Sequence, residues 1–283
     1  MMSASRTKIT LVGGGGFMGE AIATGLVRSD SLRSREITLS DPNERRLHHL
    51  QKSLDVSLRS DNVSAIQDTD VVFLCIKPTH LQKVAIEIKG ALPGHALVVS
   101  IVAGADLTTV STLLDHHAVV RVMPNLPSQI CAGFLPWFAA TDLDATHATT
   151  AKELLGALGR APRVDDEKYI DLLTSVSGAG PAFTFLFIES LTDAAVHLGL
   201  PRHLAQELVI QTIEGSARLA SSSTDSPNQL RAKVTSPGGV TAESIAVLEE
   251  RGFRVALDRA AHAGYHKTIE LQNGIRSQSG SHS

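Results

Sequence analysis

The sequence predicts an α/β fold in which a doubly wound parallel sheet is followed by an all-α C-terminal half. Three observations support this prediction. Near-continuous apolar runs alternate with segments of helical periodicity up to about residue 165, which is typical of strands buried on both faces and their crossover helices. The segment Gly14–Gly19 directly follows the first apolar run. Beyond Asp165, long helical stretches with few turn signals replace the strands.

Five apolar runs in the first half predict the strands of the sheet. They are Ile9–Val12, Ile37–Leu39, Val71–Ile76, Leu97–Ile101 and Val119–Met123. The segments Glu20–Arg28 and Asn43–Ser53 separate the first three runs, and their apolar residues recur at helical spacing between polar flanks. Strands and helices that alternate in this way form βαβ units, so residues 1–165 are expected to be one domain.

The second expected domain, residues 166–283, is helical and strongly apolar. Phe183, Phe187 and Leu191 lie on one stripe of a helix that ends at Gly199. A domain of this size has more apolar surface than it can bury alone, so we expect a homodimer formed through this half. The alternative is a monomer in which the helices cap the first domain.

Proline and glycine mark the remaining helices of this domain. Pro201 opens the next helix, at a position where its missing N–H does no harm. A further helix is expected over Ala242–Glu250 and ends at Gly252. The polar tail Asn273–Ser283 is expected to be disordered.

The composition excludes several classes of protein. Of the 283 residues, 43% are hydrophobic and 19% charged, and the net charge is −3, which gives no basic surface for nucleic acid. No run reaches the roughly 20 consecutive apolar residues of a membrane-spanning helix, and residues 1–7 carry no export signal. We therefore expect a cytoplasmic protein that binds a small molecule, with no nucleic-acid or membrane partner.

The cysteines and histidines indicate neither disulfides nor metal binding. The two cysteines, Cys75 and Cys131, offer no disulfide framework, which fits a reducing compartment. The twelve histidines occur singly or in pairs such as His48-His49, without the spacing of a metal site. No bound metal is expected.

The candidate cofactor site begins at the glycine-rich segment. Its residues, Gly14, Gly15, Gly16, Phe17, Met18 and Gly19, form a G-x-G-x-x-G pattern between a predicted strand and a predicted helix. In this context the spaced glycines serve a tight turn, a close approach to a pyrophosphate, and close helix–strand packing. The N–H groups and positive dipole at the helix start favour bound phosphates. The sequence therefore predicts a Rossmann-type dinucleotide-binding domain.

Residues after the second strand bear on which dinucleotide is bound. Asp41 follows this strand, where a carboxylate accepts hydrogen bonds from a ribose 2′-OH and favours NADH. Arg45 and Arg46 come shortly after it and are able to hold a 2′-phosphate instead, so NADPH or NADH stays open. Asp41 has a second interpretation as a helix N-cap before Pro42.

The third apolar run ends in Ile76, Lys77 and Pro78. This places Lys77 at the carboxyl edge of a predicted strand, where ligands of doubly wound sheets bind. The alternative for Lys77 is a solvated lysine at a strand end.

Two glycine-rich segments interrupt the helical half. They are Ser177–Pro181, which reads SGAGP, and Thr235–Thr241, which reads TSPGGVT. Glycine at such places indicates backbone that bends or is approached closely. The second segment leads directly into a helix, so its N–H groups form a cradle suited to a carboxylate. Ser177 and Thr241 each have an alternative role as the N-cap of the following helix.

In order along the chain, these motifs resemble the pyrroline-5-carboxylate reductase family over nearly the whole sequence. The matching segments are Gly14–Gly19, Asp61-Asn62, Ile76–Pro78, Ala103-Gly104, Met123–Asn125, Ser177–Pro181, Leu200–Arg202 and Thr235–Thr241. Many dehydrogenases share the glycine fingerprint. The S-G-x-G-P-A and T-S-P-G-G-x-T pair is therefore the specific part of the resemblance.

The resemblance implies hydride transfer from NADPH or NADH to the C=N bond of 1-pyrroline-5-carboxylate, giving L-proline. It implies cofactor binding by Gly14–Gly19, by Asp41, Asn62, Ile76, Lys77 and Pro78 around the adenosine ribose and phosphates, and by Ala103, Gly104 and Asn125 near the nicotinamide. The family also assembles through its helical domain into interlocked homodimers, often five in a ring.

For the substrate, the resemblance implies a site in the helical half. The carboxylate would lie on the backbone amides from Ser236 to Thr241, including Gly238, Gly239 and Val240, with Ser177 as a further contact. Thr241 and Ser236 are the implied catalytic residues, and the Thr241 hydroxyl would hydrogen-bond the ring nitrogen region.

The sequence departs from the family pattern at several positions. Ala179 stands where a second serine is usual, Phe183 replaces a tyrosine and Leu126 a threonine. Ala232-Lys233 replaces an acidic or amide pair before the substrate loop. These changes leave the loop amides and Thr241 in place, so we expect altered substrate affinity and the same reaction.

Two rival functions are less consistent with the sequence. A β-hydroxyacid-type dehydrogenase needs a catalytic lysine on the first long helix of the second domain, and Gly178–Leu191 contains none. A nucleotide-sensing regulator without turnover has no need of Thr241 or of the Gly238-Gly239 loop, and this chain has both.

Overall fold

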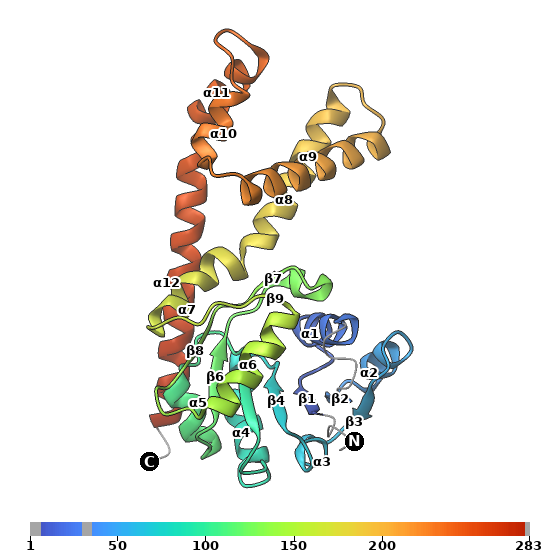
Figure 1. Cartoon of the computed structure of the whole chain (residues 1–283), viewed down its shortest axis with the longest axis vertical. Coiled ribbons are helices and arrows are strands. Elements are labelled where there is room, and N and C mark those ends of the chain that lie inside the picture. The colour runs from blue at the N-terminus through green and yellow to red at the C-terminus, as the bar shows by residue number, and fades with distance from the viewer. Residues whose placement is uncertain (1–6, 30–35, 281–283) are drawn as a thin grey trace. The chain divides into compact units, whose positions relative to one another are not determined.

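The computed structural model describes residues 7–29 and 36–280, with side chains to Ser277 (Figure 1). Contacts divide the chain into two compact units. Unit 1 contains the chain up to Ala179 together with the segment from Ala263 onward, and unit 2 is Gly180–His262. The domains expected from the sequence, 1–165 and 166–283, stay a prediction. By contacts, residues 166–179 and the C-terminal segment group with the sheet.

A seven-stranded sheet forms the centre of unit 1. Its order is β3 (Ser57–Arg59), β2 (Glu36–Ser40), β1 (Lys8–Val12), β4 (Val71–Leu74), β5 (Leu97–Ser100), β6 (Val119–Val122) and β8 (Trp137–Ala139). All neighbours are parallel except β6 and β8. The chain leaves β1 in one direction and returns to β4 on its other side, so the order reverses between β1 and β4. Ligands of such sheets bind at this point.

The predicted strands and sheet type are confirmed, with additions. The five apolar runs all form strands of the parallel sheet. The sequence prediction missed β3, which has three residues, and the antiparallel edge strand β8. It also missed a small parallel pair, β7 (Gly133–Phe134) and β9 (Gly159–Arg160). Strands this short have too few alternating residues to give a periodic signal.

Helices cover both faces of the sheet, as a doubly wound fold requires. They are α1 (Phe17–Arg28), α2 (Glu44–Gln51), α3 (Asn62–Ile66), α4 (Leu81–Ile88), α5 (Leu107–Leu114) and α6 (Ala145–Ala157). Successive strand residues enter opposite cores: Phe73 packs with residues of α1, α2 and α6, whereas Leu74 packs with residues of α3, α4 and α5. This double burial explains why the strands read as continuous apolar runs.

The C-terminal helix corrects one expectation. Helix α12 spans Phe253–Gly280, so Asn273–Gly280 is helical where disorder was expected, and residues 281–283 lie outside the described part of the chain. Ile275 is buried in the core on the α4 and α5 face, and Arg276 forms an ion pair with Asp106 at the start of α5. Such contacts with distant residues leave no trace in the composition of the tail.

Unit 2 contains helices α8 (Gly180–His197), α9 (Arg202–Ser222), α10 (Pro227–Lys233) and α11 (Val240–Glu250), and the first turns of α12. The predicted helix end at Gly199 is confirmed, because this residue has a φ of 105°. Pro201 is the N-cap of α9 and stands one residue before its first turn. The predicted third helix and its end at Gly252 are also confirmed.

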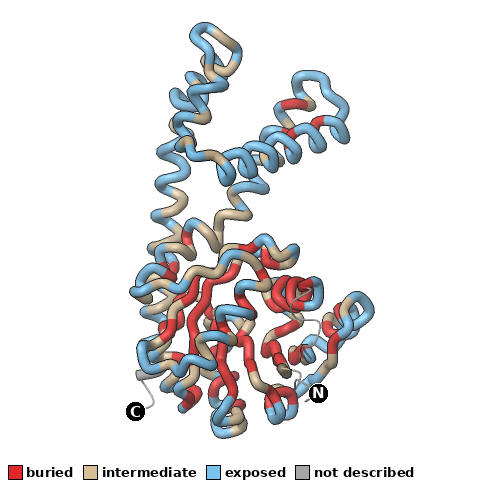
Figure 2. The backbone as a smooth tube through the Cα atoms, in the orientation of Figure 1, coloured by how far each residue is buried: buried red, intermediate tan, exposed pale blue. Residues whose placement is uncertain are grey.

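Most large apolar side chains of unit 2 are exposed within a single chain. Figure 2 shows that exposed residues, in pale blue, predominate along these helices. They include Phe185, Leu186, Phe187, Leu191, Leu204, Leu208, Val247, Leu248, Val255 and Leu257. The buried residues between α8 and α9 are small, namely Thr192, Ala195, Ala205 and Val209. The apolar surface of unit 2 is therefore available for a partner.

One helical run, Lys168–His197, is long and apolar enough by composition to cross a membrane. It contains Asp171, Glu189 and Asp193, and its part from Gly180 onward forms part of the exposed apolar surface of unit 2. The same features are typical of a helix that another protein chain covers.

Candidate cofactor and substrate sites

The glycine loop lies at the point where the strand order reverses. The N–H groups of Gly13 and Gly14 donate to the Ser40 carbonyl at the end of β2, over 2.8 and 3.0 Å. The Gly16 N–H donates back to the Gly13 carbonyl over 3.1 Å. Helix α1 follows directly, with Gly16 as its N-cap. Among the described residues, no hydrogen-bond acceptor is found for the N–H groups of Phe17 and Met18, so they are available to an anion.

The glycines of this loop are needed for different reasons. A Cβ on Gly19 would lie 2.7 Å from the Gly13 carbonyl oxygen, and one on Gly14 would lie 3.0 Å from Leu39. The tight turn, expected at Gly14, requires a positive φ at Gly13, which lies one residue before the predicted motif. A Cβ on Gly16 would meet no protein atom closer than 3.4 Å. The fold itself therefore does not require glycine at position 16, whereas a phosphate against the backbone does.

Asp41 points into the glycine loop. Its Oδ2 accepts a hydrogen bond from the Gly15 N–H over 3.2 Å, and its Oδ1 accepts one from the Asn43 N–H over 2.9 Å. The N-cap of α2 is Asn43, whose side chain accepts from the Arg46 N–H. The interpretation of Asp41 as the helix N-cap is therefore wrong.

Asn62 is held next to the same end of β2. The buried Ser40 hydroxyl donates to Asn62 Oδ1 over 2.7 Å, and Asn62 Nδ2 donates to Glu87 over 3.1 Å. Because the Ser40 carbonyl also receives the Gly13 and Gly14 N–H groups, one residue ties Asn62 to the glycine loop. The structure thus groups the glycine loop, Asp41 and Asn62.

Ile76, Lys77 and Pro78 follow β4 on the other side of β1. The Gly13 turn packs closely against this strand end, since a Cβ on Gly13 would lie 2.6 Å from the Cys75 carbonyl oxygen. The Lys77 side chain is exposed beyond the strand. Pro78 opens a short 3₁₀ helix, Pro78–His80.

Ala103 and Gly104 form a turn that helix α12 covers. Gly104 has a φ of 74°, and a Cβ there would lie 2.9 Å from the Gln272 backbone nitrogen. Glycine at position 104 is therefore required by the turn and by the close approach of α12. The sequence prediction placed these two residues near the nicotinamide without this packing role.

The structure brings together Asn125 and Ser177, which lie 52 residues apart. Asn125 Nδ2 donates to the Ser177 carbonyl over 3.2 Å and to its hydroxyl over 3.3 Å. Asn125 Oδ1 accepts from the Phe134 N–H over 2.9 Å. One of these residues was predicted to bind cofactor and the other substrate, and both belong to unit 1.

Ser177 does not cap a helix, contrary to one of its two interpretations. It lies in a π-helical segment, Thr174–Gly178, that continues α7 (Lys168–Leu173). Such segments add one residue per turn, and they are frequent at functional sites. A Cβ on Gly178 or Gly180 would meet no protein atom closer than 3.7 Å, so packing within this chain does not explain these glycines.

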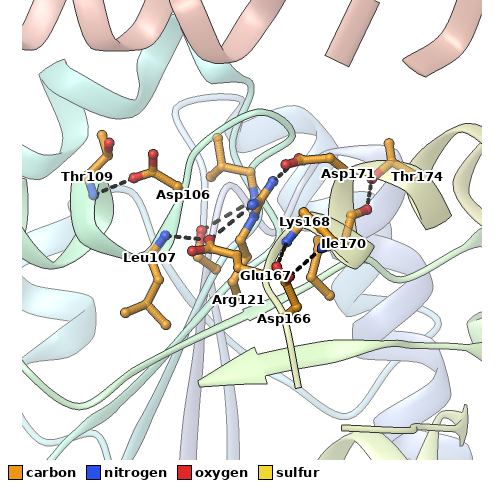
Figure 3. Close-up of polar contacts among 12 residues, drawn as sticks. Asp106, Leu107, Thr109, Arg121, Asp166, Glu167, Lys168, Ile170, Asp171 and Thr174 are labelled. Atoms are coloured by element: carbon orange, nitrogen blue, oxygen red, sulfur yellow. Dashed lines mark hydrogen bonds and ion pairs between the residues drawn. The ribbon is translucent and has the colours of Figure 1, made fainter. Parts of the chain in front are cut away.

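A buried arginine anchors helix α7 on the sheet (Figure 3). Arg121 on β6 is 1% exposed and forms ion pairs with Glu167, over 3.0 Å, and with Asp171. Glu167 also accepts the Leu107 N–H over 2.7 Å. A buried charge needs such partners. The sequence prediction missed this cluster, although an arginine inside an apolar strand is a signal that a carboxylate will face it.

The Gly238-Gly239 loop leads into helix α11. Gly238 has a φ of 65° and open space around it, and Gly239 is the N-cap of α11. Thr241 lies within the first turn, so its interpretation as the N-cap is wrong. Among the described residues, no hydrogen-bond acceptor is found for the N–H groups of Gly238, Val240 and Thr241. Ser236 is exposed, and its carbonyl accepts the Gly239 N–H over 3.0 Å.

Cysteine and metal-ligating side chains form no further site in the described residues. Cys75 and Cys131 are both free, and burial raises the pKa of the Cys75 thiol. Between residues 7–29 and 36–280, no group of three or more His, Cys, Asp or Glu side chains is arranged to hold a metal ion.

Comparisons with known proteins cover both halves of the chain. A family model described as pyrroline-5-carboxylate reductase dimerisation matches residues 167–271, and one described as NADP oxidoreductase, coenzyme F420-dependent, matches residues 8–104. The pyrroline-5-carboxylate reductase of Synechocystis sp. is 38% identical over 91% of this chain and 96% of its own length. That of Pseudomonas aeruginosa is 34% identical over 94% of this chain and 97% of its own length.

Solved structures agree with these relatives. A pyrroline-5-carboxylate reductase from Coxiella burnetii matches with a TM-score of 0.79 and 34% identity, over 94% of this chain and 98% of that one. The Plasmodium falciparum pyrroline carboxylate reductase with NADP bound matches with a TM-score of 0.87 and 28% identity, over 95% of this chain and all of that one. Because full-length relatives at 34–38% identity match both halves, the chain belongs to the pyrroline-5-carboxylate reductase family.

Proposed function

We propose that this chain catalyses hydride transfer from a reduced nicotinamide dinucleotide to the C=N bond of 1-pyrroline-5-carboxylate, giving L-proline. The proposal rests above all on the full-length similarity to reductases of this name, which covers the sheet and the helical region alike. A bound nicotinamide dinucleotide supplies the hydride. The protein's part is to hold the two reactants in contact and away from water.

The residues of the glycine loop fit such a cofactor. A Cβ on Gly16, the N-cap of α1, would come no closer than 3.4 Å to the described part of the chain, where no acceptor is found for the Phe17 and Met18 N–H groups. A pyrophosphate there would receive these N–H groups and the positive end of the helix dipole. Asp41 and Asn62 would face the adenosine ribose. Ile76, Lys77 and Pro78 would line the cofactor from the end of β4.

Asn125 is expected to position the groups around the nicotinamide. Its amide nitrogen donates to the Ser177 carbonyl and hydroxyl, and its amide oxygen accepts from the Phe134 N–H. It thereby fixes the Ser177 hydroxyl, which we assign to substrate binding. Ala103 and Gly104 complete this end of the proposed site, and their turn is braced by α12.

The Gly238-Gly239 loop is assigned to the substrate carboxylate. The free N–H groups of Gly238, Val240 and Thr241 lie at the start of an eleven-residue helix, where negative charge is stabilised. The Thr241 hydroxyl makes no capping hydrogen bond and is available to the imine nitrogen. Ser236 and Gly239 shape the loop. Thr241 and Ser236 are the proposed catalytic residues, because they offer hydroxyl groups beside this anion cradle.

The assembly and compartment complete the proposal. The exposed apolar helices of unit 2, within the region matched by the dimerisation model, support a homodimer. We extend this to a pentamer of dimers, as the family resemblance implies, and to a location in the cytoplasm, as expected from the sequence.

One assay tests the reaction. The purified chain is mixed with 1-pyrroline-5-carboxylate and either NADPH or NADH, the loss of cofactor absorbance is followed, and the product is identified by chromatography. We expect cofactor oxidation that depends on substrate and yields proline in equal amount. Oxidation without proline, or proline formed equally by a mock preparation that lacks this chain, would refute the proposal.

A further inference from the structure

The end of strand β2 holds a fixed negative charge where the two possible cofactors differ. We propose that Asp41 makes this chain select NADH over NADPH. The inference rests on the proposed function, because it assumes that a dinucleotide occupies the glycine loop. NADPH differs from NADH by a 2′-phosphate on the adenosine ribose, so the charges near that ribose decide the selection.

Two backbone N–H groups hold the Asp41 carboxylate in place. The Gly15 N–H donates to Oδ2 over 3.2 Å, and the Asn43 N–H donates to Oδ1 over 2.9 Å. A Cβ on Gly15 would lie only 2.8 Å from the Asp41 Cγ. The carboxylate therefore packs directly on the middle of the glycine loop and cannot turn away without losing both hydrogen bonds.

A carboxylate in this position treats the two cofactors differently. It accepts a hydrogen bond from a ribose 2′-OH, which stabilises NADH. A 2′-phosphate would bring a second anion against a fixed carboxylate, and it offers no hydrogen to donate when fully ionised. Like charges at such contact distances disfavour binding strongly.

The nearby arginines do not offset this repulsion. Arg46 is already paired with Glu20 of α1, and both side chains are largely buried, at 30% and 26% exposure. Arg45 is exposed on α2, and it is rotated by about 100° around the helix from Arg46, which faces α1. Lys77 lies beyond β4, on the far side of β1 from the end of β2. Arg59, the register partner of Ser40 on β3, is exposed, and its guanidinium donates to the Leu58 carbonyl over 2.9 Å. Asp41 is thus the charged group that backbone N–H groups hold against the glycine loop.

The test measures selection by binding and by turnover on the full chain. Dissociation constants for NADH and NADPH come from fluorescence titration without substrate, and kcat/KM for each cofactor comes from the reductase assay. We expect the wild type to favour NADH by at least about tenfold, because the Asp41 carboxylate repels the 2′-phosphate of NADPH. Asp41→Asn keeps the size and one of the two acceptor oxygens but removes the charge. This substitution should reduce the preference for NADH over NADPH, measured as the ratio of the two kcat/KM values and as the ratio of the two affinities, by at least about tenfold.

A second variant tests the arginine argument. Glu20→Gln releases Arg46 from its ion pair, so NADPH binding should become stronger by about threefold or more while NADH binding changes little. The matched control is Asp142→Asn, which removes one exposed negative charge beyond β8, at the opposite edge of the sheet. This control should leave the ratio unchanged.

The outcomes separate this inference from the proposed function. A wild type that favours NADPH, or an Asp41→Asn ratio equal to that of the wild type, overturns the inference. If the titrations favour NADH through Asp41 but neither cofactor reduces 1-pyrroline-5-carboxylate, the cofactor selection stands and the proposed reaction fails.

Discussion

Single residues of the glycine loop carry separable tasks, and Gly16 is the one that packing within the loop does not explain. Its backbone is extended, with a φ of −72°, and a Cβ would have room. Gly16→Val should therefore fold normally but lose cofactor binding, because the side chain occupies the space of the pyrophosphate. Loss of two charged hydrogen bonds at about 1.5 to 3 kcal/mol each predicts a dissociation constant raised by more than about hundredfold.

The measurement is the fluorescence titration of NADH, together with a thermal melt. The control is Gly156→Ala on the exposed face of α6, where a Cβ meets nothing within 4 Å. That substitution should leave binding unchanged and raise the free energy of unfolding by about 0.5 to 1 kcal/mol. If Gly16→Val still binds NADH tightly, the pyrophosphate does not bind against this loop.

Thr241 had two possible roles from the sequence, and the structure excludes one of them, the N-cap of α11. Because Gly239 is the N-cap of α11, the Thr241 hydroxyl is not needed to begin the helix. Thr241→Ala should leave the melting temperature almost unchanged and reduce kcat/KM for 1-pyrroline-5-carboxylate by about 10- to 100-fold, the value of one hydrogen bond to a charged group. Thr241→Ser keeps the hydroxyl and should retain most activity. Equal steady-state kinetics for wild type and Thr241→Ala would leave Thr241 with no catalytic task.

At the scale of elements, helix α12 is attached to the sheet half by a titratable contact. Arg276 donates from Nε and a terminal nitrogen to Asp106, over 3.0 and 2.6 Å. Burial raises the pKa of the Asp106 carboxyl, but hydrogen bonds from Thr109 and the ion pair with Arg276 outweigh burial and hold the pKa below its usual 3.8. The carboxylate is thus more acidic in the folded chain than in the unfolded chain.

The lowered pKa of Asp106 determines how the free energy of unfolding depends on pH. The ion pair contributes to the free energy of unfolding above about pH 4 and loses that contribution as the pH falls through the lowered pKa. Arg276→Gln should lower the free energy of unfolding at pH 7 by about 0.5 to 1 kcal/mol, since the arginine is partly exposed. The difference from the wild type should shrink below about pH 4.

Urea unfolding at equal protein concentration measures the free energies of unfolding of the wild type and Arg276→Gln, at pH 7 and below pH 4. Lys267→Gln breaks an exposed pair with Glu270 on the same helix and serves as the control, with little change expected at either pH. If the difference in free energy of unfolding between the wild type and Arg276→Gln grows as the pH falls, the Arg276–Asp106 ion pair is not its cause.

Helices and strands were predictable where their own residues show an apolar run, helical spacing of apolar residues, or a glycine at the end of a helix. The strands from Ile9 to Met123 are buried on both faces and read as continuous apolar runs, and the end of α8 needs the positive φ that Gly199 provides. The π-helical segment Thr174–Gly178 and the helical tail Asn273–Gly280 escaped prediction. Their conformations depend on partners such as Asn125 and Asp106, which lie far away in the chain.

For the whole molecule, the exposed apolar surface of unit 2 predicts self-association. Leu186 on α8 is 62% exposed, a large apolar side chain in the region matched by the dimerisation model. Leu186→Asp should convert the wild-type oligomer to smaller species, because a charge cannot be buried in an apolar interface without a partner. Size-exclusion chromatography with light scattering gives the mass.

The control for this prediction is Ile86→Asp on α4 in unit 1. Ile86 is also highly exposed, at 69%, but it lies outside the matched dimerisation region. It should leave the mass unchanged. A wild type that is monomeric at micromolar concentration would contradict the prediction and restore the alternative of a monomeric helical cap.

The sequence by itself determined the sheet type, the glycine loop and the family, because these depend on local signals: apolar runs, glycine at fixed spacing and two specific motifs. It left Asp41, Ser177 and Thr241 each with two interpretations. Only the tertiary structure excluded the capping roles, by placing Asn43 and Gly239 at the helix starts and Ser177 inside a helical segment.

The tertiary structure alone also decided which distant groups meet. Asn125 contacts Ser177, and Arg121 contacts Asp171, across about 50 residues of chain. The physical reason is that hydrogen bonds and ion pairs of this kind form only where burial removes water and leaves one partner within reach. A residue's own neighbours in the sequence do not specify that partner, whereas they do specify whether it lies in a strand, a helix or a turn.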